Sequence, residues 1–132
     1  MSELYEARTV SVSIAAPPGT VYEYVSNPLN LPKWAFFDSV VPSGDRWLAT
    51  SSAGEADVAF APANDYGVLD HVVKPASGGE VSMPVRVMPN GDGSELIYTV
   101  FRPVGSTDDE YDRDVATVTK DLQTLKSLLE AG

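Results

Sequence analysis

Residues 107–130, TDDEYDRDVATVTKDLQTLKSLLE, decide how the rest of the chain is interpreted. Thr107 and Glu110 have the spacing of a capping box, in which each side chain bonds a free backbone N–H at the start of a helix. Apolar residues then recur at spacings of three and four, as on one side of a helix: Tyr111, Val115, Val118, Leu122, Leu125 and Leu129. The pattern predicts an amphipathic helix over 108–130, roughly 35 Å long at 1.5 Å per residue.

A series of short strands and turns precedes this helix. Six segments have the alternation or the β-branched and aromatic content of strands: FFDSVV, DRWLATS, ADVAFA, YGVLDHVVK, EVSMPVRVM and SELIYTVFR. The clearest turn between them is Asn90-Gly91, because a type I′ hairpin needs a positive φ at both central residues. Consecutive strands joined by short turns predict an antiparallel meander.

The N-terminal region adds one strand and two short helices. Residues 8–14, RTVSVSI, alternate between polar and apolar side chains, which is typical of a half-buried strand. In AAPPGTVYEYVSNP the prolines suit the first turn of a helix, and PLNLPKW predicts a second helical piece. The sheet and the long helix each have an apolar side to bury, so they must share one core. We expect a single α+β domain over residues 1–132.

Composition excludes several functional classes. The chain has 132 residues and no cysteine, so disulfides and cysteine-based metal or redox sites are excluded. With one histidine and no calcium-type loop, we expect no metal site and no cofactor. The net charge of −10 disfavours nucleic acid and anionic membrane surfaces as partners. We see neither a secretory signal nor a membrane span, and expect a cytoplasmic protein.

Strand alternation assigns side chains to the two faces of the sheet. Asp70 and His71 are adjacent, so in a regular strand they point to opposite faces and cannot form an Asp–His dyad. His71 shares its parity with Leu69 and Val73, which predicts that it faces the long helix. The same argument predicts further inward-facing residues: Val10, Val12, Ile14, Trp47, Ala49, Ser51, Val58, Phe60, Met83, Val85, Val87, Leu96, Tyr98 and Val100.

Three interpretations of His71, the only histidine, remain open. It can be a packed core residue bonded to one hydroxyl such as that of Tyr98. It can orient a ligand, or it can act as a general base, for which a near-neutral pKa is suited. The sequence names no second inward-facing carboxylate that would orient the imidazole ring.

The aromatic residues have a similar pair of interpretations. Trp34 and Trp47, with several Phe and Tyr, can line a cavity for a planar or lipid-like ligand, and each alone is explained by core packing. Arg102 and Asp38 are candidates for the rim of such a cavity, and a solvated strand or loop end is the preferred explanation of each.

The whole order resembles the helix-grip superfamily of START-like proteins, which shares the birch-pollen-allergen fold. Within it the chain is similar to the polyketide cyclase/dehydrase-like (SRPBCC) proteins. Four stretches carry the resemblance: SIAAPPGTVYEYVSNPLNLPKWA, GVLDHVV, PVRVMPNGDGSELIYTVFRP and DLQTLKSLLE. The resemblance implies a curved seven-stranded antiparallel sheet wrapped on the C-terminal helix, with two short helices after the first strand. It also implies a cavity between sheet and helix in which many relatives bind small hydrophobic molecules.

We therefore expect the chain to bind a small hydrophobic, aromatic or lipid-like molecule between the sheet and the C-terminal helix. The residues expected to line this site are Trp34, Trp47, Phe60, His71, Met83, Tyr98 and Val118. A second hypothesis is a cyclase/dehydrase-like enzyme, in which His71 moves a proton and Tyr98 donates a hydrogen bond to an oxyanion. A third is a co-chaperone-like interaction module with a filled core. The sequence leaves the ligand and the oligomeric state open.

Overall fold

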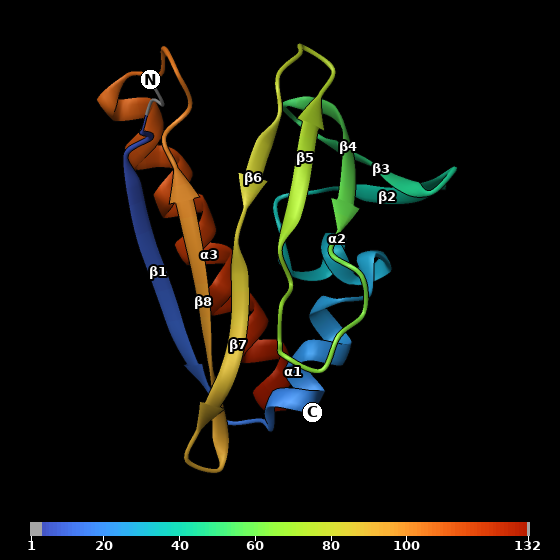
Figure 1. Ribbon diagram of the computed structural model, residues 1–132, viewed down its shortest axis with the longest axis vertical. Coiled ribbons are helices and arrows are strands. Elements are labelled where there is room, and N and C mark those ends of the chain that lie inside the picture. The colour runs from blue at the N-terminus through green and yellow to red at the C-terminus, as the bar shows by residue number, and fades with distance from the viewer. Residues whose placement is uncertain (1–3, 132) are drawn as a thin grey trace.

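A computed structural model describes residues 4–131, so residues 1–3 and 132 of the expected 1–132 domain lie outside the described part. Strands and helices follow one another in the expected order (Figure 1). Their bounds are β1 Ala7–Ile14, α1 Pro18–Val25, the 3-10 helix η1 Pro28–Asn30, α2 Leu31–Trp34, β2 Ser39–Ser43, β3 Arg46–Ser51, β4 Gly54–Phe60, β5 His71–Pro75, β6 Val81–Met83, β7 Val85–Asn90, β8 Gly93–Phe101 and α3 Asp108–Ala131.

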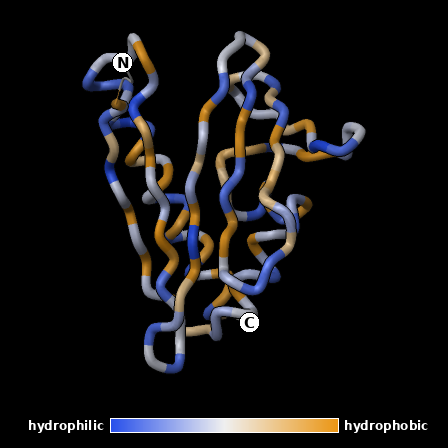
Figure 2. The backbone as a smooth tube through the Cα atoms, viewed as in Figure 1, coloured by the Kyte–Doolittle hydropathy of each residue, from blue (hydrophilic) through white to orange (hydrophobic). Residues whose placement is uncertain are grey.

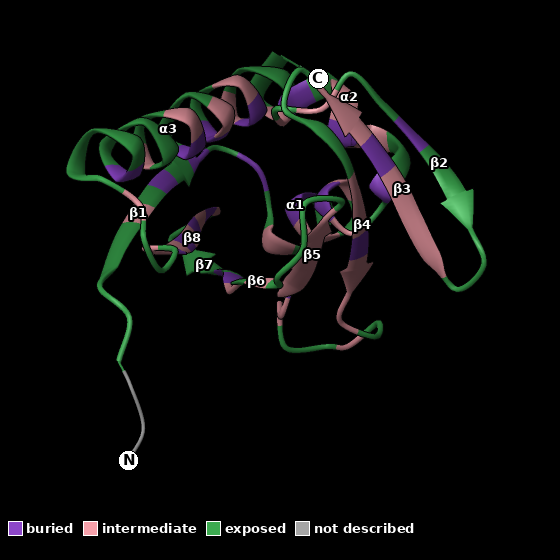
Figure 3. Cartoon of the chain, turned by 90° about the horizontal axis from the view of Figure 1, so that it is seen from above, coloured by how far each residue is buried: buried purple, intermediate pink, exposed green. Residues whose placement is uncertain are grey.

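The strands form two antiparallel sheets that curve around one side of α3 (Figures 1 and 3). One sheet has the order β1-β8-β7, and the other has the order β2-β3-β4-β5-β6. Helix α3 packs against β1 and β8, and its C-terminal half also contacts α2. The α+β class, the curved antiparallel strands and the long C-terminal helix are therefore as expected.

The number of strands differs from the expected seven, because EVSMPVRVM is two strands and not one. Pro84 lies between β6 and β7 and has no backbone N–H to donate, so the hydrogen-bond ladder is interrupted there. The Pro84 carbonyl still accepts a bond of 3.0 Å from the backbone N–H of Thr99. Beyond this bond β6 pairs with β5 and β8 pairs with β1, so the sheet separates between β6 and β8.

The expected strand YGVLDHVVK is also divided, and regular pairing in β5 begins only at His71. Its first part, residues 67–69, pairs with β7 instead, through the Leu69 N–H to the Val85 carbonyl at 2.8 Å. The Val85 N–H then donates a hydrogen bond of 2.8 Å to the side-chain carboxylate of Asp70. This bond takes the place of a backbone bond at the point where the chain stops pairing with β7 and enters β5. Residues 67–70 therefore connect the two sheets.

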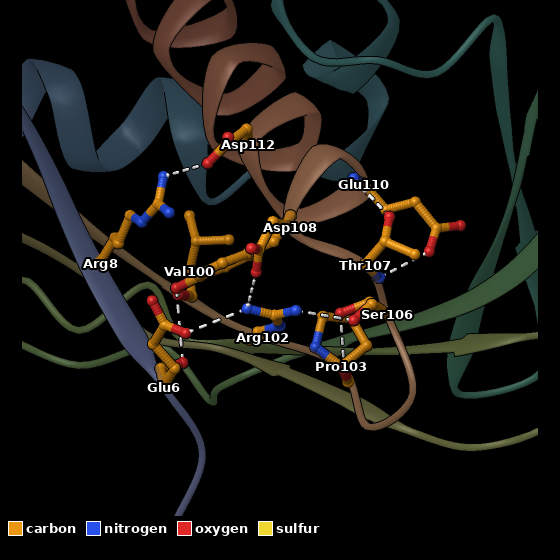
Figure 4. Close-up of polar contacts among 11 residues, drawn as sticks. Glu6, Arg8, Val100, Arg102, Pro103, Ser106, Thr107, Asp108, Glu110 and Asp112 are labelled. Atoms are coloured by element: carbon orange, nitrogen blue, oxygen red, sulfur yellow. Dashed lines mark hydrogen bonds and ion pairs between the residues drawn. The ribbon is translucent and has the colours of Figure 1, made fainter.

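Helix α3 begins as the capping box predicts. The Thr107 N–H donates to Glu110 at 2.8 Å, and the Glu110 N–H donates to the Thr107 hydroxyl at 3.1 Å (Figure 4). Arg102 donates to Asp108 at 2.7 Å and also pairs with Glu6, so it is a structural residue at the strand end and not a free rim cation. The Tyr111 hydroxyl donates to the Val100 carbonyl at 2.6 Å, which fixes the start of α3 on β8.

Hydrophobic and hydrophilic residues alternate along the strands (Figure 2), and the residues buried in the core follow this alternation. Val12 and Ile14 of β1 are buried together with Leu96, Tyr98 and Val100 of β8. The helix contributes the predicted stripe, of which Tyr111, Val118, Leu122 and Leu125 are buried. The expected strand FFDSVV begins three residues later, at Ser39, because Phe36 and Phe37 lie in a turn closed by the Phe37 N–H to the Ala35 carbonyl. No helix among residues 4–131 has both the length and the apolarity to cross a bilayer.

Candidate functional site

His71 lies at the centre of an aromatic cluster on the inner face of the five-stranded sheet. Its cross-strand partners are Phe60 on β4 and Met83 on β6. The ring centroids of Phe60 and His71 are 4.8 Å apart, and the ring of Tyr98 meets His71 edge-on at 6.0 Å. The sequence predicted that these four side chains share a face, and the register brings them together.

The two ring nitrogens of His71 have different partners. Nδ1 lies 3.2 Å from the Leu69 carbonyl oxygen, which can only accept, so Nδ1 carries the proton. Nε2 is then the acceptor for the Tyr98 hydroxyl at 3.4 Å. This is the hydroxyl partner expected for a packed histidine. The oxygen of Tyr98 retains lone-pair capacity for one further donor.

Asp70 does not contribute to this cluster, as the parity of the strand predicts. Its carboxylate takes a bidentate pair of bonds from Arg86 on the outer face, at 3.1 Å and 2.8 Å. Arg86 holds the pKa of Asp70 below its ordinary value. In the described residues no carboxylate hydrogen-bonds to His71, so the imidazole is oriented by a backbone carbonyl and a phenol.

Burial keeps the His71–Tyr98 pair uncharged near neutral pH. Desolvation lowers the pKa of His71, because the imidazolium form would lose hydration. Desolvation also raises the pKa of Tyr98, since its phenolate would lose hydration in the same way. The pair therefore presents two neutral hydrogen-bonding groups.

The inner face of the five-stranded sheet is less covered than that of the three-stranded sheet. On β1 and β8 the inward side chains Val12, Leu96 and Val100 are buried under α3. On β3 to β6 many inward side chains are only partly buried (Figure 3): Trp47, Phe60, His71, Val73, Val81 and Met83. A filled core would bury residues of this size, so solvent reaches this part of the inner face.

The other predicted lining residues lie around this cluster, not within it. Trp47 is on the same inner face, across the strands through Val58 and Val73. Val118 is buried on the inward side of α3. Trp34, at the end of α2, is 5% exposed and packs in the core near α3.

Asp121 of α3 is a candidate that the sequence analysis missed. It lies next to the apolar stripe, three residues after Val118 and four before Leu125, and is only partly exposed. Burial raises its pKa to about 6, although the Phe36 backbone N–H and Lys120 act in the opposite direction. The sequence indicated this position only through its spacing from Val118 and Leu125, which places Asp121 beside the apolar side of the helix.

An apolar opening lies where β6 and β8 separate. It has a volume of about 770 Å³, and its lining includes Pro75, Val81, Ser82, Phe101, Arg102 and Val104. Pro75 and Val81 share the inward parity of β5 and β6, whereas Ser82 and Phe101 have the outward parity. The opening therefore borders both faces of the sheet. In the described residues no three His, Cys, Asp or Glu side chains are placed to hold a metal.

Comparison with solved structures identifies the architecture. The chain superposes on protein MLL2253 from Mesorhizobium loti with a TM-score of 0.76 and 16% identity, over 96% of this chain and 98% of that one. It superposes on Ara h 8.0201 with a TM-score of 0.70 and 14% identity, over 98% and 100%. It superposes on the Aha1 dimer structure from Colwellia psychrerythraea with a TM-score of 0.71 and 15% identity, over 95% of this chain and 96% of that one.

These likenesses establish the fold alone, because the identities are low. No protein-family model and no curated protein sequence matches the chain. The architecture, an antiparallel sheet gripping a long C-terminal helix, is the helix-grip fold expected from the sequence.

Proposed function

Since the chain has the helix-grip fold, we propose that it binds a small, mostly apolar molecule between the five-stranded sheet and α3. The observation that carries this proposal is the incomplete cover of the inner face. Trp47, Phe60 and Met83 point inward and yet remain partly exposed. An apolar ligand that covers them gains roughly 25 cal/mol for each Å² of apolar surface removed from water.

The His71–Tyr98 pair supplies the polar contact. Tyr98 uses its proton on His71, so its oxygen can accept a hydrogen bond from a ligand hydroxyl or N–H group. Both side chains are neutral because of their burial, which favours an uncharged ligand group over an ion. The pair thus orients a molecule whose affinity comes mainly from apolar contact.

Access to this face is supported by the opening between β6 and β8. Its volume of about 770 Å³ is in the range of ligand sites in proteins. Val81 lines it and also belongs to the inner face, so a ligand entering there reaches the strand that carries Met83.

A cyclase/dehydrase-like reaction at the same site is the second candidate, and the neutral imidazole of His71 is the observation that favours it. A base must accept a proton, and a depressed pKa leaves His71 in the accepting form. Nε2, however, is engaged by Tyr98, which must be displaced before a substrate proton can reach it. Replacing His71 by Ala separates the two functions: it weakens binding and leaves it detectable, whereas it abolishes turnover of any substrate found.

Native mass spectrometry of the purified protein, followed by organic extraction, tests binding directly. The matched variants are Val73→Trp and Val72→Trp, which are adjacent on β5 and point to opposite faces. Tryptophan at position 73 fills the inner face and should remove the extracted molecule or reduce the affinity for 2-naphthol at least tenfold. Tryptophan at position 72 should change neither.

Equal occupancy in the two variants, with both folded by circular dichroism, places the ligand elsewhere and overturns the proposal. A protein that carries no molecule and fails to bind 2-naphthol also overturns it. If Val73→Trp does not fold, His71→Ala serves as the second variant, and unchanged 2-naphthol affinity there contradicts the assigned polar contact.

A further inference from the structure

The opening between β6 and β8 connects the inner face of the sheet with the outside of the molecule. Beyond the bond from the Thr99 N–H to the Pro84 carbonyl, the two strands diverge toward the connection between β8 and α3 (Figure 1). Val81, which has the inward parity, and Phe101, which has the outward parity, both line the opening. A ligand that fills the opening therefore contacts both sides of the sheet.

An uncovered apolar patch lies at the outer part of this opening. It consists of Tyr5, Phe101 and Val104, which we call the mouth patch. Tyr5 is 56% exposed and Val104 is 79% exposed, and the rings of Tyr5 and Phe101 meet edge-on with centroids 6.4 Å apart. Apolar side chains that gather at an opening, unlike single exposed ones, are typical of binding surfaces. The proposed function leaves the mouth patch without a role.

The charged side chains of the opening already have counter-ions within the chain. Arg102 pairs with Asp108 at 2.7 Å and with Glu6 at 3.3 Å. Glu80 pairs with Lys74 at 3.6 Å. Arg102 and Glu80 are the only charged residues in the lining among residues 4–131, so the opening favours an uncharged, apolar part of a ligand.

The path from the His71–Tyr98 pair to the opening is short and apolar. Met83 is the cross-strand partner of His71, and Val81 is that of Val73. Val81 precedes Met83 by two residues, which places the opening about 7 Å along β6 from the row that contains His71. An extended alkyl chain advances by about 1.3 Å per carbon, because a C–C bond is about 1.5 Å long. A hydroxyl at Tyr98 with a chain of about six carbons therefore reaches the opening, and a longer chain continues through it.

We propose that the ligand is a long-chain molecule with one uncharged polar end, whose polar end binds the His71–Tyr98 pair while its alkyl chain passes between β6 and β8 and covers the mouth patch. The proposal rests on the proposed function, because it keeps the same polar contact and adds the length and shape of the apolar part. A ligand confined to the inner face would leave Tyr5 and Val104 exposed.

Two alcohols that differ only in chain length test the proposal. By the same spacing 1-hexanol ends near the opening, whereas 1-dodecanol extends beyond it. Displacement of 2-naphthol, followed by the fluorescence of 2-naphthol, measures the affinity of each alcohol. In the wild-type chain 1-dodecanol should bind at least a hundredfold more tightly than 1-hexanol, because each buried CH₂ contributes roughly fourfold.

A double variant, Tyr5→Ser with Val104→Ser, separates the mouth patch from general apolar binding. It should weaken 1-dodecanol binding at least tenfold and leave 1-hexanol binding unchanged. Val41→Ser with Met88→Ser is the matched control, because these side chains are 50% and 43% exposed and do not line the opening. The control should change neither affinity.

Nuclear Overhauser effects locate the end of the chain directly. The terminal methyl group of bound 1-dodecanol should give cross-peaks to the methyl groups of Val104, whose signals are identified by Val104→Ser. The same methyl group of 1-hexanol should give none. Cross-peaks from 1-dodecanol only to other residues would overturn the proposal.

The outcomes separate this proposal from the proposed function. If both alcohols displace 2-naphthol and the folded double variant binds 1-dodecanol as the wild type does, the passage between β6 and β8 is wrong while apolar binding stands. The same holds if 2-naphthol binds and neither alcohol displaces it. If 2-naphthol itself does not bind, both proposals are overturned.

Two further results are decisive. A double variant that changes the oligomeric state in native mass spectrometry, and not the affinity for 1-dodecanol, assigns the mouth patch to a second copy of the chain and overturns the proposal. If the double variant does not fold, Val104→Ser alone replaces it. That variant should weaken 1-dodecanol binding at least threefold, and an unchanged affinity contradicts the proposal.

Discussion

The hydroxyl of Tyr98 on β8 lies 3.4 Å from Nε2 of His71 on β5, so the contact joins side chains of two different sheets. β8 and β5 are not paired with each other, but both flank the segment that runs from β6 through Pro84 into β7, where Met83 pairs with His71 and Val85 pairs with Tyr98. The pair therefore depends on how the sheets are joined at residues 67–70 and Pro84.

Tyr98→Phe should lower the free energy of unfolding by about 1 kcal/mol, because it removes one hydrogen bond and leaves Nε2 of His71 without its donor. Urea unfolding followed by circular dichroism measures the change. Tyr66→Phe is the control, since Tyr66 is 85% exposed and its hydroxyl has no partner within residues 4–131. Equal stability of the two variants would show that the Tyr98–His71 bond does not stabilise the fold.

His71 should make the protein less stable as the solution becomes acidic. Its pKa in the folded state is below the ordinary value, so below about pH 6.5 the unfolded chain binds a proton that the folded chain does not. The stabilising contribution is present above that pH and decreases as pH falls toward the folded pKa. The difference in unfolding free energy between pH 7 and pH 5 should become smaller in His71→Gln; an unchanged difference would contradict the buried neutral histidine.

Asp121, unlike His71, should make the protein more stable as the solution becomes acidic. Its pKa is raised from 3.8 to about 6, so between these values the folded chain holds a proton that the unfolded chain has lost. The carboxylate is destabilising above pH 6, and the penalty disappears as pH falls toward 4. Asp121→Asn should raise the free energy of unfolding at pH 8 by about 1 kcal/mol, a value reduced for partial exposure.

Chemical denaturation at pH 8 and pH 4.5 measures this effect. The gain from Asp121→Asn should be clear at pH 8 and close to zero at pH 4.5. Asp109→Asn provides the comparison for removing one acidic charge from the exposed part of α3. If the two substitutions give the same gain at both pH values, general charge reduction accounts for it and the burial of Asp121 does not.

Gly67→Ala should be strongly destabilising, because Gly67 has φ +73° and an added Cβ would collide with the carbonyl oxygen of Val87. Gly44→Ala is a matched control, with φ +65° and open space around the added atom. We expect about 1 kcal/mol of lost stability for Gly44→Ala from backbone strain. Gly67→Ala should lose a further amount of about 2 kcal/mol from the collision. Similar midpoints in thermal unfolding would indicate that residues 67–69 do not pack closely on β7.

Several features could be derived from local sequence alone. The capping box of Thr107 and Glu110 formed as predicted, because its two bonds join residues three positions apart. The opposite orientation of Asp70 and His71 followed from the two-residue period of a strand. The break at Pro84 was missed, although the missing N–H was visible, because an edge or bulge position would have tolerated the same residue.

Asp121 was missed for a different reason. Its raised pKa results from burial against α2 and the turn that follows it, and these residues precede it by more than 80 positions. The buried Nε1 of Trp34, which has no hydrogen-bond partner among residues 4–131, likewise depends on what surrounds the ring in three dimensions. Helical spacing places Asp121 beside the apolar stripe, but neither its degree of burial nor the surroundings of the indole nitrogen can be derived from spacing.

Alternation and capping were sufficient for the antiparallel strands, the long C-terminal helix and the inward direction of His71, since these reflect interactions between residues close in sequence. The helix-grip arrangement of these elements was expected from the family resemblance. The partners of His71, the separation of β6 from β8, and the burial of Trp34 and Asp121 required the folded chain. These features depend on the register and curvature of strands distant in sequence, which set the distances between side chains that local patterns place only on a face.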